Sequence, residues 1–120
     1  MTGEGEFHPL APDYPDHGDV RADDLGPVHP GEILLEDFLK PHGLKPYRAA
    51  ALMHVPRTRI ERLTRGETPV TVDTALRLER VFGASAAFWL NLQTHFDLQA
   101  AILALGPEIA ALKPLEIAAA

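Results

Sequence analysis

Cysteine is absent from this chain of 120 residues, which excludes a disulfide framework and any metal site built on thiolates. The sequence also contains no run of about 18 apolar residues, so no transmembrane helix is expected. Its acidic N-terminus lacks the basic start and the apolar stretch of a secretory signal. These absences predict a cytoplasmic protein without membrane contact. The length of the chain predicts one domain with a hydrophobic core.

Side chains that commonly carry catalysis or bind metals form no recognisable pattern. The six histidines are scattered, and no two of them stand four residues apart, as two ligands on one helix would. The neighbouring carboxylates Asp23-Asp24 and Glu36-Asp37 are typical of solvated acidic surface, because no nucleophile or base accompanies them. A glycine-rich phosphate loop is missing too. The sequence therefore predicts no enzyme, no cofactor and no metal site.

Charge is distributed very unevenly along the chain, whose net charge is −6. Residues 1–37 hold ten acidic residues and one basic residue, Arg21. Residues 45–65 hold six basic residues and one acidic residue, Glu61. Because the local potential governs the encounter with a charged partner, the net acidity does not exclude nucleic acid as a ligand of the basic segment.

Composition divides the chain into three parts. Residues 1–28 are rich in Pro, Asp, Gly and His without periodicity, which predicts a flexible acidic arm. Residues 29–105 carry apolar residues at helical spacing and no strand pattern, which predicts a compact all-α domain of five helices. Gly106-Pro107 is expected to end the last helix, so that residues 106–120 form a tail or a short extra helix.

Proline, glycine and capping residues delimit the five predicted helices. Thr71 and Ser85 are typical N-caps for the fourth and the fifth helix. The fourth helix is expected to turn Val72, Ala75 and Leu76 inward. The predicted helices span about residues 30–42, 46–53, 56–65, 72–82 and 86–105.

The second and third helices have the spacing of a helix-turn-helix. Ala50 is small enough to let the third helix cross the second closely, and His54 stands four positions later, where the turn favours a positive φ. Glycine is commoner at that position, but histidine tolerates the conformation better than a branched residue does. Ile60 and Leu63 then lie on one face of the third helix and are expected to be buried.

Burial of those two residues leaves an arginine-rich face pointing outward from the third helix. Arginine binds guanine with a bidentate fork, and threonine can hydrogen-bond a base or contact a thymine methyl. We assign Arg57, Thr58 and Arg62 to base edges. Contacts to phosphate, which set position and affinity, are assigned to Arg48, Arg59 and Arg65. The alternative is a face of the helix that is only solvated and basic. Glu61 is expected to pair with Arg48 or Arg65 and not to take part in chemistry.

Three segments carry a resemblance to a known family. They are HPGE at 29–32, VPRTRI followed by RG at 55–66, and TVDTALRLERVFG with FWLNLQ and FDL between 71 and 98. With them, residues 29–98 resemble the HigA (VapI-like) antitoxin family within the Xre/Cro-like helix-turn-helix group. The match adds Pro56 to the DNA-contacting residues and implies phosphate contact there. His54 departs from the usual glycine, which affects the geometry of the turn and not the fold.

The resemblance implies an antitoxin that neutralises a small, basic RelE-like ribonuclease toxin of the HigB type. It also implies repression of its own operon through dimeric binding to a palindromic operator. A stand-alone Xre-type transcriptional regulator without a toxin partner is the main alternative. A third possibility is an interaction module that has lost DNA binding, but four arginines between residues 57 and 65 argue against it.

The long fifth helix and the arm suggest where partners bind. Candidates for a homodimer seam are Phe88, Trp89, Leu92 and Phe96, since this helix exceeds what a small core needs. Alternatively, Phe88 and Trp89 only close the core against the first helix. The acidic arm is either a surface for the basic toxin or a solubilising tail.

Overall fold

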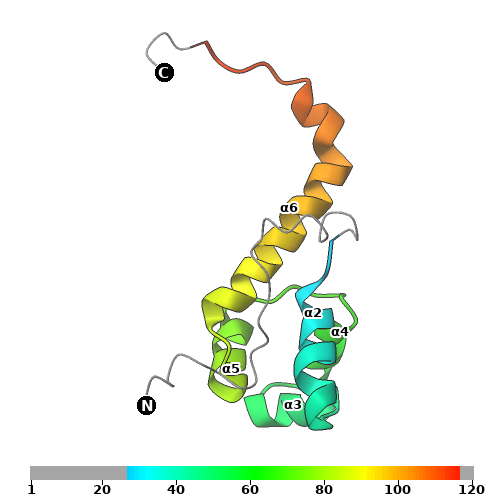
Figure 1. Ribbon diagram of the computed structural model, residues 1–120, viewed down its shortest axis with the longest axis vertical. Helices are drawn as coiled ribbons and strands as arrows, with labels where there is room; N and C mark the ends of the chain where they lie inside the picture. Colours follow the sequence, from blue (N-terminus) through cyan, green and yellow to red (C-terminus); the bar gives the residue numbers. More distant parts are fainter. Residues whose placement is uncertain (1–26, 117–120) are drawn as a thin grey trace.

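The structure is a computed structural model that describes residues 27–116. This part of the chain is all-α, as predicted, and contains no strand (Figure 1). The first three elements follow one another without a break, so the domain has five helices, as expected. The elements are α2 (Pro30–Ile33), the π-helical η1 (Leu34–Leu39), the 3-10 helical η2 (Lys40–His42), α3 (Pro46–Met53), α4 (Arg57–Thr64), α5 (Val72–Phe82) and α6 (Ala86–Ala110). The predicted acidic arm lies outside the described residues up to residue 26.

The segment HPGE fixes how the first helix meets α4. The His29 side chain caps α2, because its Nδ1 accepts a hydrogen bond of 2.9 Å from the Gly31 amide. A Cβ atom on Gly31 would lie 1.7 Å from the carbonyl oxygen of Leu63. Glycine is therefore required where the first helix passes the C-terminal end of α4.

Trp89 on α6 occupies the centre of the hydrophobic core. Its ring lies 5.0 Å from that of Phe38 on η1 and 5.1 Å from that of Phe88. Phe38 also meets Phe82 at the end of α5, with ring centroids 6.1 Å apart. This aromatic cluster joins η1, α5 and α6, and it holds the scaffold against which α3 and α4 pack.

Helix α5 buries a different face from the one expected. Thr71 caps the helix as predicted, and Ala75 is fully buried. Val72 and Leu76, however, are 60% and 55% exposed, so their predicted burial is wrong. The stripe through Ala75, Leu78 and Phe82 is buried instead, because it continues to the end of the helix, whereas the stripe through Val72 and Leu76 continues into polar residues.

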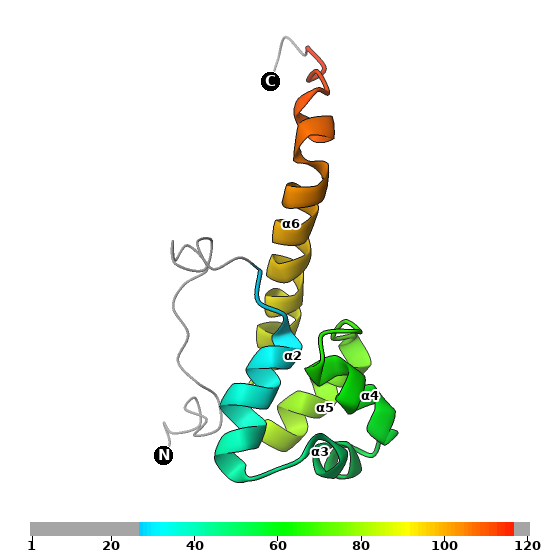
Figure 2. The same ribbon diagram turned by 90° about the vertical axis from the view of Figure 1, so that its right-hand side faces the viewer.

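Helix α6 continues past the predicted break at Gly106-Pro107 and ends at Ala110. Pro107 lies inside the helix, and the amide of Ala111 still donates to its carbonyl at 3.2 Å. Proline removes only its own amide donor and disfavours helix before itself, so one further turn can follow it. The prediction that the helix ends at residue 105 is therefore wrong. Figures 1 and 2 show the distal part of α6 projecting away from the other helices.

None of the helices within residues 27–116 combines the length and the apolar character that a membrane span needs.

Candidate DNA-binding surface

Helices α3 and α4 form the predicted helix-turn-helix. His54 ends α3 in the left-handed conformation, with φ 58° and ψ 46°, as expected for the position where glycine is commoner. Its amide donates to the Ala51 carbonyl at 3.2 Å, and the Val55 amide donates to the Ala50 carbonyl at 3.0 Å. These bonds satisfy carbonyls at the end of α3, so the turn forms without glycine.

The buried residues of this unit are also those expected from spacing. Ile60 and Leu63 have 0% and 1% of their surface exposed, and Ala50 has 1%. Since those two side chains anchor α4 in the core, the opposite face of the helix is turned outward. Arg57, Thr58 and Arg62 are exposed on it.

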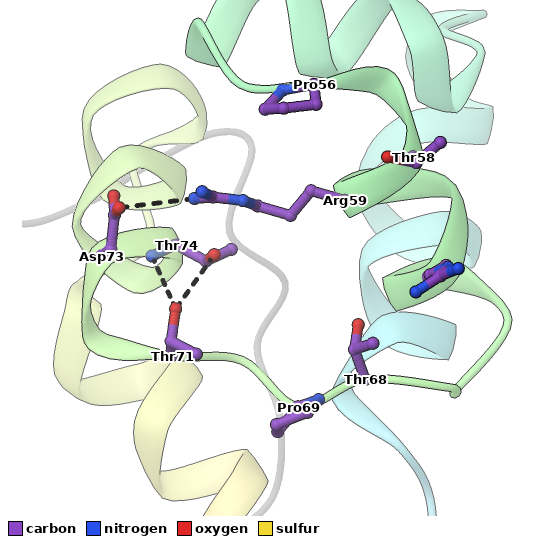
Figure 3. Close-up of a pocket in the computed structure, with 9 residues that line it drawn as sticks. Pro56, Thr58, Arg59, Thr68, Pro69, Thr71, Asp73 and Thr74 are labelled. Atoms are coloured by element: carbon purple, nitrogen blue, oxygen red, sulfur yellow. Dashed lines mark hydrogen bonds and ion pairs between the residues drawn. The ribbon is translucent and has the colours of Figure 1, made fainter.

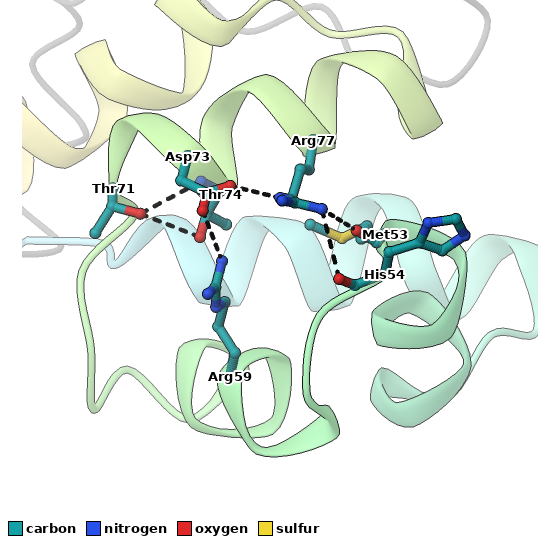
Figure 4. A network of polar contacts seen from close by, with 7 residues as sticks. All are labelled: Met53, His54, Arg59, Thr71, Asp73, Thr74 and Arg77. Atoms are coloured by element: carbon teal, nitrogen blue, oxygen red, sulfur yellow. Dashed lines mark hydrogen bonds and ion pairs between the residues drawn. The ribbon is translucent and has the colours of Figure 1, made fainter.

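A polar network ties the turn and α4 to α5, as Figure 4 shows. The Arg77 Nη1 donates to the carbonyl of Met53 at 2.8 Å and reaches that of His54 at 3.5 Å. Arg77 Nε also donates to the Asp73 carboxylate, whose other oxygen accepts from Arg59 Nη1 at 3.4 Å. One carboxylate on α5 thus joins an arginine of α4 to an arginine that fixes the end of α3.

Sequence reasoning missed both Asp73 and Arg77. Their spacing of four residues on a helix is a known signal for an ion pair, and it predicts that these two side chains meet. The bond from Arg77 to Met53 joins residues 24 positions apart, and no local pattern indicates it.

Carboxylates of the same chain hold most of the outward arginines. Arg57 pairs with Glu61 at 2.9 Å, and its guanidinium lies 5.5 Å from the centroid of the Tyr47 ring. Glu61 therefore pairs with Arg57, and the expected pairing with Arg48 or Arg65 is wrong, because Arg57 stands one helical turn before it. Arg65 pairs with Glu67 at 2.8 Å. Within residues 27–116, the Arg62 side chain makes no ion pair or hydrogen bond, although the Arg62 carbonyl accepts from the Glu67 amide at 3.0 Å.

Ion pairing shifts the pKa values of two exposed carboxyl groups. The hydrogen bond from Arg65 holds the pKa of Glu67 below its ordinary value. The hydrogen bond from Arg77 lowers the pKa of Asp73, and Arg59 contributes in the same direction. Both groups are therefore ionised at neutral pH, and their negative charges remain beside the arginines.

An open depression of about 330 Å³ lies between α4 and the start of α5. Arg59 and Arg62 line it, together with four threonines and two prolines. Figure 3 shows the Arg59 side chain reaching across it toward Asp73. The depression combines hydroxyl groups and guanidinium groups next to the outward face of α4, which suits a phosphate backbone, but Asp73 puts a negative charge at its side.

The structure corrects the expected dimer seam at Trp89. This side chain is 0% exposed and packs on Phe38, so it closes the core against the first helix, which was the alternative interpretation. Phe88, Leu92 and Phe96 are half-buried. Phe96 packs edge-on against His29, with centroids 4.9 Å apart. The exposed large apolar residues of α6 lie farther along the helix, beyond Asp97.

Comparison with known proteins agrees with this geometry. A helix-turn-helix family model matches residues 35–89. Virulence-associated protein I of Dichelobacter nodosus is 50% identical over 74 residues, which cover 62% of this chain and 68% of that protein.

Two solved structures resemble the chain in both fold and sequence. One, described as antitoxin GraA, is 38% identical with a TM-score of 0.73 over 75% of this chain and 98% of that one. The other is described as Pseudomonas aeruginosa antitoxin HigA with higBA promoter; it is 36% identical with a TM-score of 0.72, over 75% of this chain and 99% of that one. With the helix-turn-helix in place and its arginine face turned outward, the chain belongs to the HigA (VapI-like) antitoxin family of DNA-binding helix-turn-helix proteins.

Proposed function

We propose that this protein is the antitoxin of a type II toxin-antitoxin system and represses its own operon by binding an operator as a dimer. The observation that carries the DNA-binding part is the outward face of α4. Burial of Ile60 and Leu63 leaves Arg57, Thr58 and Arg62 exposed side by side along one helix. Support also comes from the Pseudomonas aeruginosa antitoxin HigA, whose structure is described with the higBA promoter.

In the proposed complex, α4 lies in the major groove of the operator. Arg57, Thr58 and Arg62 read base edges, and each good bidentate arginine contact contributes about 1–3 kcal/mol of discrimination. The flanking residues set the position of the helix on the backbone through phosphates. These flanking residues are Arg48, Pro56, Arg59 and Arg65.

The distal half of α6 is the proposed dimer seam. Leu98, Ile102, Leu105 and Ile109 follow one another at intervals of four, three and four residues, and they are between 44% and 64% exposed. This is the spacing of a coiled-coil seam, which places them in one stripe along the helix. A second copy packed on this stripe covers it and supplies the second α4 that two half-sites about 34 Å apart require. The seam therefore lies beyond Phe88, Leu92 and Phe96.

The proposed toxin partner is a small, basic ribonuclease of the RelE-like fold. Family membership supports this partner. The test is the intact mass of whatever co-purifies with the tagged protein from its native locus after a high-salt wash. A stoichiometric small basic partner is expected. A lone dimer that still binds its promoter DNA would instead establish the alternative, a stand-alone regulator of the Xre type.

The acidic arm is proposed to cover part of the basic toxin. The proposal rests on the charge of residues 1–28, most of which lie outside the described part of the chain. Deletion of residues 1–28 is expected to weaken the toxin complex and to leave operator affinity unchanged. If the truncated chain binds toxin as tightly as the full chain, the arm has no such role.

Two substitutions, one on α4 and one at Arg65 directly after it, test the proposed DNA contacts. Arg62→Ala is expected to weaken operator binding by about 1–3 kcal/mol and to relax preference at one base pair. Arg65→Ala is expected to weaken binding to all sequences alike and to reduce the salt slope by about one. Affinity for promoter and scrambled duplexes over a range of salt concentrations measures both effects, and Arg80→Ala on α5 controls for the lost charge. Unchanged specific binding by Arg62→Ala would contradict the placement of α4.

A further inference from the structure

Arginines on the proposed DNA-binding face already have negatively charged partners in the free protein. Three of the four arginines between residues 57 and 65 are held by carboxylates of the same chain. The pairs are Arg57–Glu61 at 2.9 Å, Arg59–Asp73 at 3.4 Å and Arg65–Glu67 at 2.8 Å. Each carboxylate occupies the guanidinium group that a DNA phosphate or a guanine base would bind.

We propose that Glu61, Glu67 and Asp73 are specificity-determining residues that suppress binding to DNA outside the operator. These restraining carboxylates compete with phosphate for Arg57 and Arg59 on α4 and for Arg65 directly after it. The proposal rests on the proposed function, since it concerns the selectivity of the same surface. Specificity requires that wrong partners are disfavoured, and a like charge placed against a phosphate does so.

Asp73 is the strongest of the three because two arginines hold it. Arg59 reaches it from α4, and Arg77 binds it from the next turn of α5 (Figure 4). Arg77 is itself fixed by its bond of 2.8 Å to the Met53 carbonyl. The carboxylate therefore stays in place when DNA approaches, while Glu61 and Glu67 each hold only one arginine, on a side chain that is longer by one methylene.

The location of Asp73 supports the same role. It lines the depression beside α4 that otherwise offers Arg59, Arg62 and threonine hydroxyls to a phosphate (Figure 3). A phosphate that enters the depression is repelled by the carboxylate and has to replace it as the partner of Arg59. At the operator, the base contacts of α4 offset this cost, whereas a random sequence provides no such contacts.

The salt dependence of binding distinguishes this role from a structural one. Binding outside the operator is mainly electrostatic, and its salt slope grows by about 0.9 for each additional phosphate that the protein neutralises. Release of one arginine from its carboxylate should therefore strengthen binding to DNA outside the operator and steepen its salt slope. Loss of a merely structural contact would weaken binding or leave it unchanged.

The test is Asp73→Asn in the full chain, with Glu79→Gln as the matched control. Both variants remove one negative charge from an exposed position on α5, but Glu79 pairs with no arginine of α4 within the described residues. Affinities for the promoter duplex and for a scrambled duplex of equal length are measured by fluorescence anisotropy over a range of salt. For Asp73→Asn, we expect scrambled DNA to bind roughly fivefold more tightly near 0.1 M salt, with a slope steeper by about one. The ratio of operator to scrambled affinity should fall.

Each outcome decides the proposal. It is overturned if Asp73→Asn binds scrambled DNA no more tightly than Glu79→Gln does. Glu67→Gln, which releases Arg65 without touching the network at the turn, is expected to show a similar gain, and it provides a second test if Asp73→Asn misfolds. Failure of the proposed function has a different signature: the wild-type chain would then not distinguish promoter from scrambled duplex. The gain on scrambled DNA remains measurable in that case.

Discussion

Helix α6 has two halves with opposite surroundings. Up to Asp97 it forms part of the domain, and Trp89 and Gln93 are buried there. Beyond Asp97 it leaves the other helices, as Figures 1 and 2 show. The leucines and isoleucines of this half are exposed. Both halves are apolar at helical spacing, so hydrophobicity alone does not tell a core from an interface. The presence or absence of a facing helix decides between them.

Gln93 shows where the buried half ends. Its Oε1 accepts a hydrogen bond of 2.8 Å from the Val70 amide, and its Nε2 donates to Asp97 at 3.0 Å. The side chain thus satisfies a buried amide in the segment before α5.

Trp89→Ala should have the largest effect on stability. It removes the central side chain of the core and leaves a cavity against Phe38, so we expect the free energy of unfolding to fall by about 3–5 kcal/mol. Urea unfolding monitored by circular dichroism measures the change. Leu103→Ala is the matched control in the exposed half, where Leu103 is 73% exposed, and it should change stability by less than about 0.5 kcal/mol. Equal losses in the two variants would break the distinction between the halves.

Gln93→Leu should lower the free energy of unfolding by less than Trp89→Ala does. The Val70 amide would remain buried without an acceptor, which is expected to destabilise the domain by about 1–3 kcal/mol. Asp97→Asn keeps an oxygen that accepts from Gln93 and serves as the control, with a smaller loss. If Gln93→Leu were neutral in urea unfolding, the bond to Val70 would not hold the buried half in place.

Ile102→Glu should separate the subunits without unfolding them. A charge in the exposed stripe of the distal half opposes pairing with a second copy, so the mass measured by light scattering should halve. Ala100→Glu adds the same charge on the opposite face of the helix and should leave the dimer intact. The far-ultraviolet circular dichroism of the domain should change little in both variants. A dimer that survives Ile102→Glu would move the seam elsewhere.

The smallest effect is expected from pH, at the His29–Phe96 contact that closes the buried half. Burial lowers the pKa of His29 below its ordinary value, and its Nδ1 accepts the hydrogen bond from Gly31. The unfolded chain therefore binds this proton more readily than the folded chain does. The contribution of neutral His29 to the free energy of unfolding should be fully present above about pH 6.5. It should decline slightly as the pH falls below that value. Thermal unfolding between about pH 7.5 and 5 measures the decline, which His29→Asn should reduce because asparagine can also cap α2.

Local spacing was enough to predict the helix-turn-helix, because Ala50, Ile60 and Leu63 stand within one short segment. The left-handed conformation of His54 was predictable for the same reason. Val72 and Leu76 were misassigned because two stripes overlap on α5, and only a packing partner selects between them. The contacts of Asp73 with Arg59 and of Arg77 with Met53 were not predicted, because each joins residues that are far apart in the sequence. Pro107 was misread because a proline removes one hydrogen bond and does not always end a helix.

The most direct test of the central proposal, that α4 reads operator DNA, is a hydroxyl-radical footprint of the wild-type chain and of Arg62→Ala on the DNA upstream of its own gene. We expect the wild-type chain to protect two half-sites about one helical turn apart, and Arg62→Ala to lose that protection at the same concentration. Absence of protection by the wild-type chain, or an unchanged footprint with Arg62→Ala, would contradict the proposal.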